Sequence, residues 1–388
     1  MRVLLVSAHG ADTSYGGAER YVADLARGLR GRGHEAIILS AFPPHQLPNG
    51  IDAVALYASD WRTSETRRLR NHLHDAVGLP SPRVARAIDD ARPDLVHTNN
   101  LPGISTTIWA SARRRSLPVV HTLHDYYLLC PRTTLTRRDG TRCQPHPLLC
   151  GARTRRLRRF AHAVTDVIAG SEHLHHVHRG FFPGARNSVV RLPIVPWPGI
   201  APRQPDALRT IGYIGGLTSI KGVRQLVDAA PALSELGVTL RLAGDGPLRP
   251  EVEAAAARGS LVYDGFVDGA AKSAFFAGCD VGVVQSEWDE PSGPPYVVCE
   301  WLAAGRPVLA SERGGLAEAA STLGGVLLLE PSARGVVMAV RPLRAEQEFR
   351  AVVASVPTAD ASDFDRWLDE HEQIYASAMT APVTGAAA

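Results

Sequence analysis

One stretch of this chain decides its fold: Gln285-Ser-Glu-Trp-Asp-Glu-Pro-Ser-Gly-Pro-Pro-Tyr-Val-Val-Cys-Glu-Trp-Leu-Ala-Ala-Gly-Arg-Pro-Val-Leu-Ala-Ser311. An apolar run at 281–284 precedes it, a helix is predicted from near Pro294 to Gly305, and a second apolar run follows at 307–310. Strand, helix and strand in this order predict a parallel sheet with a crossover helix. Because open α/β sheets bind ligands at the carboxyl edge of their strands, we expect Glu300 on that helix to hold a ligand's hydroxyl groups.

The same alternation fills most of the chain, which at 388 residues is too long for one ordinary domain. Strand-like runs lie at 3–6, 36–39, 95–97, 119–122, 166–169 and 188–191, then at 210–214, 239–243, 261–263, 281–284, 307–310 and 326–329. Predicted helices fill the gaps, including 17–30, 82–91 and 154–162 in the first half. Each half therefore indicates a doubly wound, Rossmann-like α/β domain, and a ligand is expected in the cleft that two such domains face.

A proline-rich stretch with little periodicity, Leu192–Asp206, marks the linker between the halves. We predict an N-terminal domain over 1–198 and a C-terminal domain over 199–362. The amphipathic segment 363–378 is predicted to be a helix, and the residues after it a frayed tail.

Charge is unevenly divided between the halves. Residues 1–200 carry 27 Arg, no Lys and 15 acidic residues, a balance of +12, whereas the remainder has a balance of −9. The basic half favours contact with an anionic substrate or membrane face, although solvated arginine-rich helices would give the same composition. No apolar run approaches the length of a membrane span, and Met1–Ser7 is too short for a signal peptide, so we expect a cytoplasmic protein with no nucleic-acid partner.

Glycines and charged residues follow several strands at the edge where ligands bind. Gly16-Gly17 comes before the first long helix, where backbone amides favour an anion. His124 follows the run at 119–122, and Lys221, one of only two lysines beside 40 arginines, precedes a predicted helix. A further glycine turn, Gly244 and Gly246, follows the run at 239–243.

These motifs, in this order, resemble glycosyltransferase family 4, whose members are retaining enzymes of the GT-B fold. The segment from Glu300 to Ser311 is similar to the family's E-A-(M/L)-A-x-G-x-P-V, and Gly215 to Gly222 to its G-R-L-x-x-x-K-G, with Gly216 in place of the arginine. The resemblance implies that Gly16, Gly17, Lys221 and the turns at Gly216, Gly244 and Gly246 serve the donor's diphosphate. It also implies that Glu300 binds the ribose and that His124 reaches the donor sugar. In the GT-B fold that the resemblance implies, the helix 363–378 packs back on the N-terminal domain.

One spacing departs from the family pattern. Family members place seven residues between two glutamates, whereas nine separate Glu290 from Glu300. Either the loop carries a two-residue insertion and Glu290 contacts the donor sugar, or Ser292 occupies the first-glutamate position.

The sequence therefore predicts a retaining glycosyltransferase that moves a sugar from a nucleoside diphosphate sugar, favoured to be a UDP-sugar, to a hydroxyl acceptor in polysaccharide, glycolipid or natural-product glycoside synthesis. His124, Lys221 and Glu290 are the predicted catalytic residues, without an obligatory metal or other cofactor. The alternatives are a UDP-sugar epimerase or phosphorylase of the same fold, or a non-catalytic relative that binds nucleotide sugars. Cys130, Cys143 and Cys150, with His146 among them, leave both reduced thiols and a zinc site open.

Overall fold

The computed structural model describes residues 1–11, 16–43, 47, 53–57, 78, 80–137, 140–144, 147–197 and 206–380. The chain divides into two compact units. Unit 1 comprises 1–135, 143–190 and 365–388, and unit 2 comprises 136–142 and 191–364. The units thus part at residue 190, whereas the predicted boundary followed residue 198. The predicted tail beyond Thr380 and most of the linker lie outside the described residues.

Unit 1 is built on a seven-stranded sheet in the order β3-β2-β1-β4-β5-β6-β7, with every neighbouring pair parallel. Its strands are β1 (Arg2–Ser7), β2 (Glu35–Ser40), β3 (Ala53–Ala55), β4 (Leu95–Thr98), β5 (Val119–Leu123), β6 (Asp166–Ala169) and β7 (Arg186–Val189). Its helices are α1 (Gly17–Gly31), α3 (Pro82–Ala91), α4 (Thr107–Arg113), α5 (Leu148–Arg158), α6 (Glu172–His178) and α14 (Ser362–Thr380). The central strands are buried on both faces, as a helix-covered parallel sheet requires.

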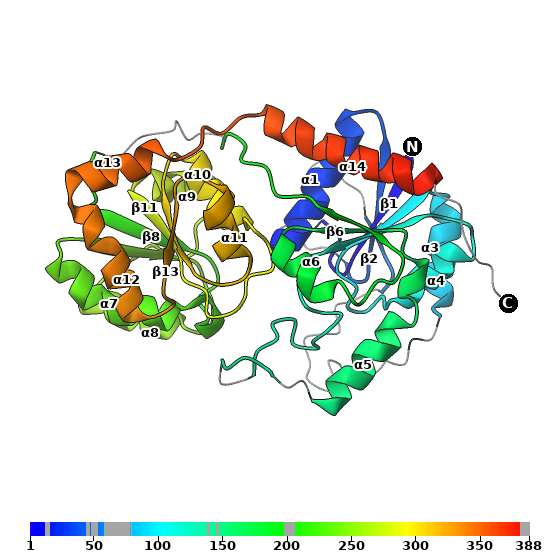
Figure 1. Cartoon of the computed structure of the whole chain (residues 1–388), viewed down its shortest axis with the longest axis horizontal. Helices are drawn as coiled ribbons and strands as arrows, with labels where there is room; N and C mark the ends of the chain where they lie inside the picture. The colour runs from blue at the N-terminus through cyan, green and yellow to red at the C-terminus, as the bar shows by residue number, and fades with distance from the viewer. Residues whose placement is uncertain are drawn as a thin grey trace. The chain divides into compact units, whose positions relative to one another are not determined.

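Helix α14 completes unit 1 by lying along α1 (Figure 1). A side chain at Gly28 would collide with Leu368, so this glycine lets the two helices approach closely. Arg32, just after α1, contacts Asp369 at 2.5 Å and Glu372 at 2.9 Å on α14. The last helix is thus attached to unit 1 by packing and by ion pairs.

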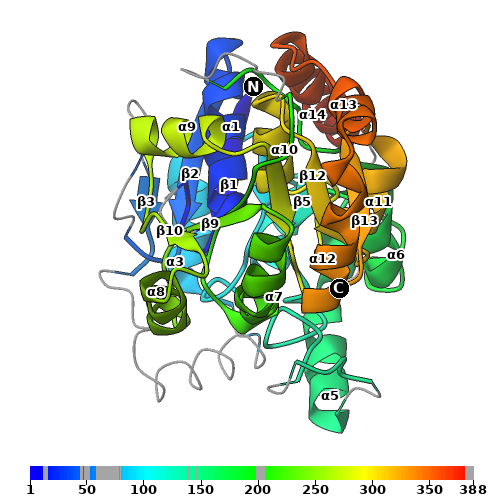
Figure 2. The same cartoon turned by 90° about the vertical axis from the view of Figure 1, so that its left-hand side faces the viewer.

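Unit 2 is a six-stranded parallel sheet in the order β10-β9-β8-β11-β12-β13, surrounded by helices (Figure 2). Its strands are β8 (Thr210–Ile214), β9 (Thr239–Ala243), β10 (Val262–Tyr263), β11 (Val281–Val284), β12 (Val308–Ser311) and β13 (Val326–Leu329). Its helices are α7 (Val223–Glu235), α8 (Arg249–Ala257), α9 (Gly269–Ala277), α10 (Tyr296–Ala303), α11 (Gly315–Thr322), α12 (Ala333–Val340) and α13 (Glu346–Ala354).

Helix α10 packs against this sheet mainly through the side chain of Trp301. A Cβ at Gly282 of β11 would lie 2.5 Å from the Trp301 ring, and one at Gly212 of β8 would lie 2.8 Å from it. The two glycines therefore leave the space that the fully buried indole fills, and Phe276 packs on its edge at 4.4 Å. This contact fixes the orientation of α10 and of Glu300, the residue before Trp301.

The sheet order confirms the predicted fold class of two doubly wound α/β domains. One predicted helix was wrong in position: α5 spans Leu148–Arg158 rather than 154–162. The last strand of unit 1 is Arg186–Val189 rather than 188–191. Among the described residues, no helix is long and apolar enough to cross a bilayer.

Candidate functional site

Two predicted site residues meet at the carboxyl edge of the unit 2 sheet. Lys221 ends a short 3-10 turn (Ser219–Lys221) after β8, and Glu290 lies in the loop after β11. The Lys221 Nζ donates to Glu290 Oε1 at 2.5 Å and lies 5.4 Å from the centre of the Trp288 ring. An ammonium, a carboxylate and an aromatic face are thus gathered at the edge where α/β sheets bind ligands.

The Glu290 carboxylate is held in place by three donors. Besides Lys221, the Ser286 hydroxyl donates to its Oε1 at 2.5 Å and the Trp288 indole N–H at 2.9 Å. Glu290 is only 4% exposed, and a buried carboxylate is stable as an anion only when it is paired in this way. Burial and the Glu290 charge together raise the pKa of Tyr213 above its ordinary value, so its hydroxyl stays protonated and donates to the Gly216 carbonyl at 2.8 Å.

The backbone at Glu290 is held by the loop that precedes α11. Glu290 forms an isolated parallel bridge with Gly314, and its carbonyl accepts from the Gly315 N–H at 2.7 Å. A Cβ at Gly314 would lie 2.5 Å from that carbonyl oxygen, and Gly314 has φ +54°, so the position requires glycine. The structure therefore places Glu290 beside Lys221, while Ser292 lies two residues further along in a half-buried position.

Glu300 and the second lysine form a similar pair. Glu300 is 5% exposed, and its Oε1 accepts from the Lys272 Nζ of α9 at 2.8 Å. The Lys272 ammonium lies 4.7 Å from the centre of the Trp197 ring. Both lysines of the chain are thus bound to the two glutamates that the sequence singled out, a pairing that the sequence did not predict.

The glycine turns of unit 2 have different roles. A Cβ at Gly244 would lie 1.9 Å from the Gly215 carbonyl oxygen, and one at Gly246 would lie 2.6 Å from the Leu217 carbonyl oxygen. These two glycines let the loops after β8 and β9 pack backbone to backbone. Gly216 is different, because the nearest atom to a Cβ there is Thr218 Cγ2 at 4.0 Å, and a larger side chain would fit.

In unit 1, His124 follows β5 and is held by Asn99 and Tyr21. Its Nε2 lies 2.8 Å from Asn99 Oδ1, and because an amide oxygen only accepts, this nitrogen carries the proton. The Tyr21 ring packs edge-on against the imidazole at 4.9 Å. Burial lowers the pKa of His124 to about 3, so the ring is neutral near pH 7, and burial raises the pKa of the neighbouring Asp125 to about 6.

Gly16 and Gly17 begin α1, and both are exposed. Gly16 is the N-cap, and its carbonyl accepts from the Arg20 N–H at 3.1 Å. Exposed amides at the start of a 15-residue helix suit an anionic group. The residues just before them, 12–15, lie outside the described part.

Sequence reasoning missed a set of buried hydrogen bonds that hold Tyr21, the residue that packs against His124. The Tyr21 hydroxyl lies 2.5 Å from His371 Nε2 of α14, and His371 Nδ1 lies 2.6 Å from the Trp367 carbonyl oxygen. On the same helix, the Tyr375 hydroxyl lies 2.6 Å from His97 Nδ1 of β4. The signal was available, because Trp367, His371 and Tyr375 are four apart and so share one face of α14.

Cys130, Cys143 and Cys150, the last of which lies in α5, are free thiols, and burial together with their mutual proximity raises the pKa of Cys150. No group of three or more His, Cys, Asp or Glu residues suited to a metal occurs in the described part of the chain. His146 lies outside that part.

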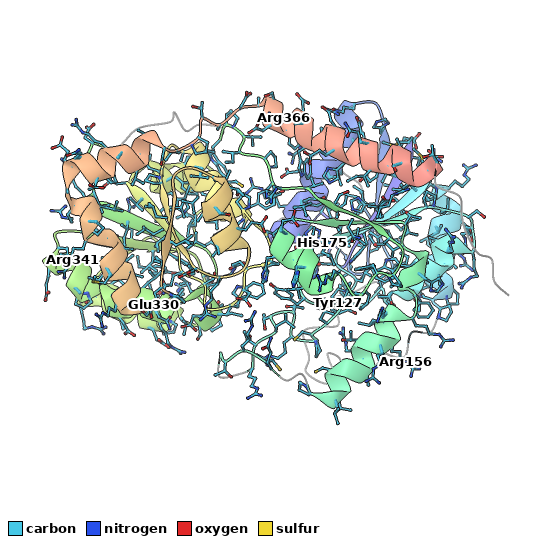
Figure 3. The ribbon with its side chains drawn as sticks, in the orientation of Figure 1. Tyr127, Arg156, His175, Glu330, Arg341 and Arg366 are labelled. Atoms are coloured by element: carbon cyan, nitrogen blue, oxygen red, sulfur yellow. The ribbon has the colours of Figure 1, made fainter. Side chains whose placement is uncertain are left out.

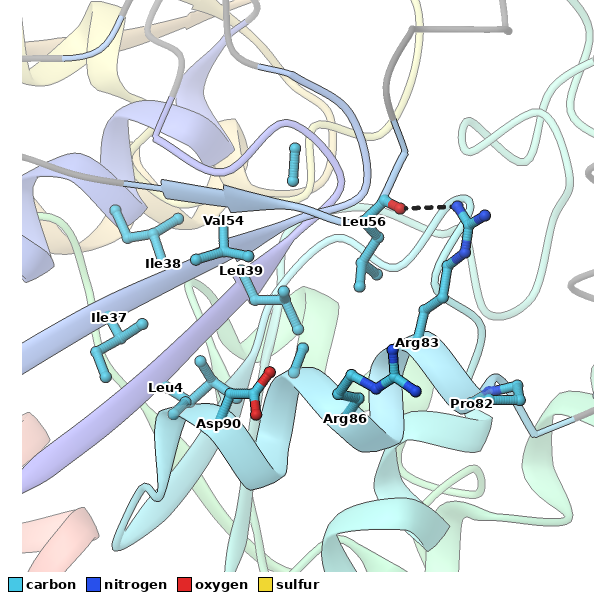
Figure 4. Close-up of a pocket in the computed structure, with 13 residues that line it drawn as sticks. Leu4, Ile37, Ile38, Leu39, Val54, Leu56, Pro82, Arg83, Arg86 and Asp90 are labelled. Carbon is cyan, nitrogen blue, oxygen red and sulfur yellow. Dashed lines mark hydrogen bonds between the residues drawn. The ribbon is translucent and has the colours of Figure 1, made fainter.

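A hollow of about 570 Å³ lies elsewhere in unit 1, between β2, β3 and α3 (Figure 4). It is lined by aliphatic side chains such as Ile38 and Val54, and Arg83 at its rim donates to the Leu56 carbonyl at 3.1 Å. None of the predicted site residues lines it, so we do not assign it to the site.

Comparison with known proteins shows which proteins this chain resembles. The family profile Glycosyltransferase Family 4 matches residues 15–195, and the profile Glycosyl transferases group 1 matches residues 208–345. An uncharacterized 42.6 kDa protein in the cps region of Klebsiella pneumoniae is 27% identical over 352 residues, 85% of this chain and 90% of that protein. Glycogen synthase of Mycobacterium tuberculosis is 27% identical over 412 residues, 94% of this chain and 91% of that protein.

Among solved structures, HepE from Anabaena in complex with UDP superposes with a TM-score of 0.68 at 20% identity, covering 97% of this chain and 100% of that one. The two parallel-sheet units have the fold of this structure, and together with the two family profiles they define an enzyme of the GT-B glycosyltransferase class. Within it, the chain is a group 1 glycosyltransferase, with an N-terminal domain of the Glycosyltransferase Family 4 type and a C-terminal domain of the group 1 type.

Proposed function

We propose that this glycosyltransferase transfers a sugar from a nucleoside diphosphate sugar to a hydroxyl acceptor with retention of configuration. The observation that carries the proposal is the contact of Lys221 with Glu290 at the carboxyl edge of the unit 2 sheet. Leaving-group departure from such a donor develops negative charge on the diphosphate and positive charge on the sugar. A cation and an anion held together at one sheet edge match that charge separation.

Each residue then has a distinct proposed role. Lys221 stabilises the leaving diphosphate, and the exposed amides of Gly16 and Gly17 act on the same group. Glu290 contacts the transferred sugar, and Glu300 holds the ribose hydroxyls. The neutral His124, whose Nε2–H donates to Asn99, accepts a hydrogen bond from a hydroxyl of the donor sugar through its Nδ1. Electrostatic stabilisation of charge carries the reaction in this scheme, and no protein nucleophile or obligatory metal is required.

We propose a UDP-sugar as donor because HepE, whose fold this chain shares, has been solved in complex with UDP. The product would be a polysaccharide, glycolipid or natural-product glycoside. We further propose a cytoplasmic enzyme whose basic unit 1 contacts an anionic membrane face, in keeping with the +12 balance of residues 1–200.

The test is a panel of UDP-, GDP- and ADP-sugars without added acceptor, followed by chromatography and mass spectrometry. A transferase is expected to release nucleoside diphosphate slowly by hydrolysis, and faster when a sugar acceptor is added. An epimerase would give an isomeric nucleotide sugar with no release, and a phosphorylase would require orthophosphate. Binding of a donor without any product would favour the non-catalytic alternative and contradict the proposal.

A further inference from the structure

Helix α5 (Leu148–Arg158) is attached to unit 1 along one face only. The Arg153 guanidinium donates to the Tyr127 carbonyl at 2.7 Å and lies over the Tyr127 ring at 4.6 Å. The Thr154 hydroxyl donates to the Leu129 carbonyl at 3.2 Å, and Leu157 is almost fully buried. These contacts pack the inner face of the helix against unit 1, and the opposite face does not contribute to the core of unit 1.

The opposite face carries an unusual combination of side chains. Leu148 and Leu149 are 91% and 85% exposed, the two highest values among the exposed large hydrophobic residues of the described part. Arg155, Arg158 and Arg159 are also exposed. At 100° per residue, Leu148, Arg155 and Arg159 point in nearly the same direction, away from Arg153 and Leu157. In Figure 3, Arg156 marks this helix and Tyr127 lies nearer to the strands.

The surrounding sequence strengthens the charge. From Gly140 to Thr165 the chain has six arginines and neither Asp nor Glu. Two exposed leucines in the first turn cost free energy in water, and their burial is favourable by about 1.5–3 kcal/mol each. A partner must therefore offer an apolar interior just beneath a negatively charged surface, and an anionic lipid bilayer has that order of layers.

We propose that the exposed side of α5, with Leu148, Arg155 and Arg159 at its centre and Leu149 and Arg158 at its two opposite edges, docks on an anionic bilayer. The two leucines enter the boundary between headgroups and acyl chains, and the arginines pair with lipid phosphates. This inference rests on the proposed membrane contact and names the surface that makes it. Because Arg153 of α5 donates to the carbonyl of Tyr127, three residues after His124, docking would hold unit 1 by an element attached to the segment that carries this site residue.

The experiment is flotation of the full chain with vesicles of phosphatidylcholine alone or with about 30% phosphatidylglycerol, an amount that gives a clearly negative surface. Wild type is expected to float with the anionic vesicles only, and less as salt rises. Replacing Arg155, Arg158 and Arg159 with Gln should weaken binding about fivefold per residue, hence on the order of a hundredfold in total. Leu148→Ser with Leu149→Ser should weaken it about tenfold or more while leaving the charge unchanged.

A matched control removes three exposed arginines of unit 1 outside α5: Arg86, Arg114 and Arg179, each changed to Gln. The control loses the same charge and should keep more than half of the binding. Equal loss in the control, equal binding to neutral vesicles, or full binding by the leucine variant would overturn the proposal. A shift from dimer to monomer in the leucine variant, without any lipid binding by wild type, would show a second copy as the partner. Donor hydrolysis in solution should be unchanged in every variant, so failure of the docking surface is separable from failure of the proposed transferase activity.

Discussion

The two glutamates of unit 2 offer a matched pair of substitutions, Glu290→Gln and Glu300→Gln. Both carboxylates are almost fully buried, and each accepts from a lysine ammonium, at 2.5 Å and 2.8 Å. Glutamine keeps the shape and an acceptor oxygen but removes the charge. Weakening a buried ion pair should therefore lower the free energy of unfolding in both variants, by about 1–3 kcal/mol. Only the difference between the two variants reports on the roles of the two glutamates.

We expect the two variants to separate free-nucleotide affinity from rate. A hydrogen bond to a charged group contributes about 1.5–3 kcal/mol, so Glu300→Gln should weaken UDP and the UDP-sugar alike by roughly 10- to 150-fold. Glu290→Gln should leave the UDP dissociation constant within about threefold, because its proposed partner is the transferred sugar. Its kcat should fall by roughly 30- to 150-fold, which corresponds to about 2–3 kcal/mol of lost transition-state stabilisation.

Calorimetry with free UDP, turnover assays and chemical unfolding of the same preparations make the comparison. The roles are wrong if Glu290→Gln weakens UDP as much as Glu300→Gln does. They are also wrong if Glu290→Gln turns over normally and Ser292→Ala is inactive, since Ser292 would then be the functional residue of the loop. Equal losses of stability with unequal kinetic effects would support the assignment most directly.

Four further predictions concern the same enzyme. Lys221→Ala should lower kcat/KM by roughly 30- to 150-fold, because it removes the proposed diphosphate cation, and normal activity in a folded variant would exclude Lys221 from the site. Gly216→Arg, which restores the arginine of the family motif, should fold because a Cβ at this position meets open space. The variant should bind the donor more tightly in calorimetry. Weaker donor binding would show that an arginine at this position does not contact the donor's diphosphate in this enzyme. Turnover should persist in excess EDTA, and loss of activity that magnesium or manganese restores would contradict a metal-independent diphosphate site. Burial lowers the pKa of His121 to about 3 and that of His371 to about 4. Below pH 6.5 the unfolded chain therefore binds protons that the folded chain does not. The free energy of unfolding should fall as pH falls, by roughly 1 kcal/mol per histidine at pH 5.5. No histidine occurs in unit 2, so hydrogen exchange at pH 5.5 should show weaker protection in unit 1 only, and equal weakening of both units would contradict this origin.

Much of the sheet framework was predictable because parallel strands covered by helices are short apolar runs. The runs at 210–214, 239–243 and 281–284 match β8, β9 and β11 residue for residue. The edge strand β3 was missed because it has three residues, two of them exposed, and so lacks that pattern. Helix α5 was placed too late because Leu148 and Leu149 were not expected at a helix start that leaves them in solvent.

The site residues were predicted by type and order, but their contacts were not. Spacing alone left Glu290 and Ser292 as rivals, since an insertion can be placed anywhere in a loop. The structure adds the bridge between Glu290 and Gly314, which holds Glu290 beside Lys221, and no local sequence pattern predicts a bridge between residues 24 apart. The support of His124 by Tyr21 and His371 spans 350 positions, and only the fold brings these residues together.

The choice of lysine at two places in an arginine-rich chain has a common physical reason. Lys221 and Lys272 each meet one oxygen of a nearly buried glutamate, and each lies against an indole, Trp288 or Trp197. An ammonium is a compact charge with three donors on a flexible stem, whereas a guanidinium brings five N–H groups in a rigid plane. Each lysine meets a single glutamate oxygen, so an arginine at either position would bring N–H groups that this contact does not use. The two lysines are therefore best understood as geometric requirements of two carboxylates whose orientation the proposed reaction depends on.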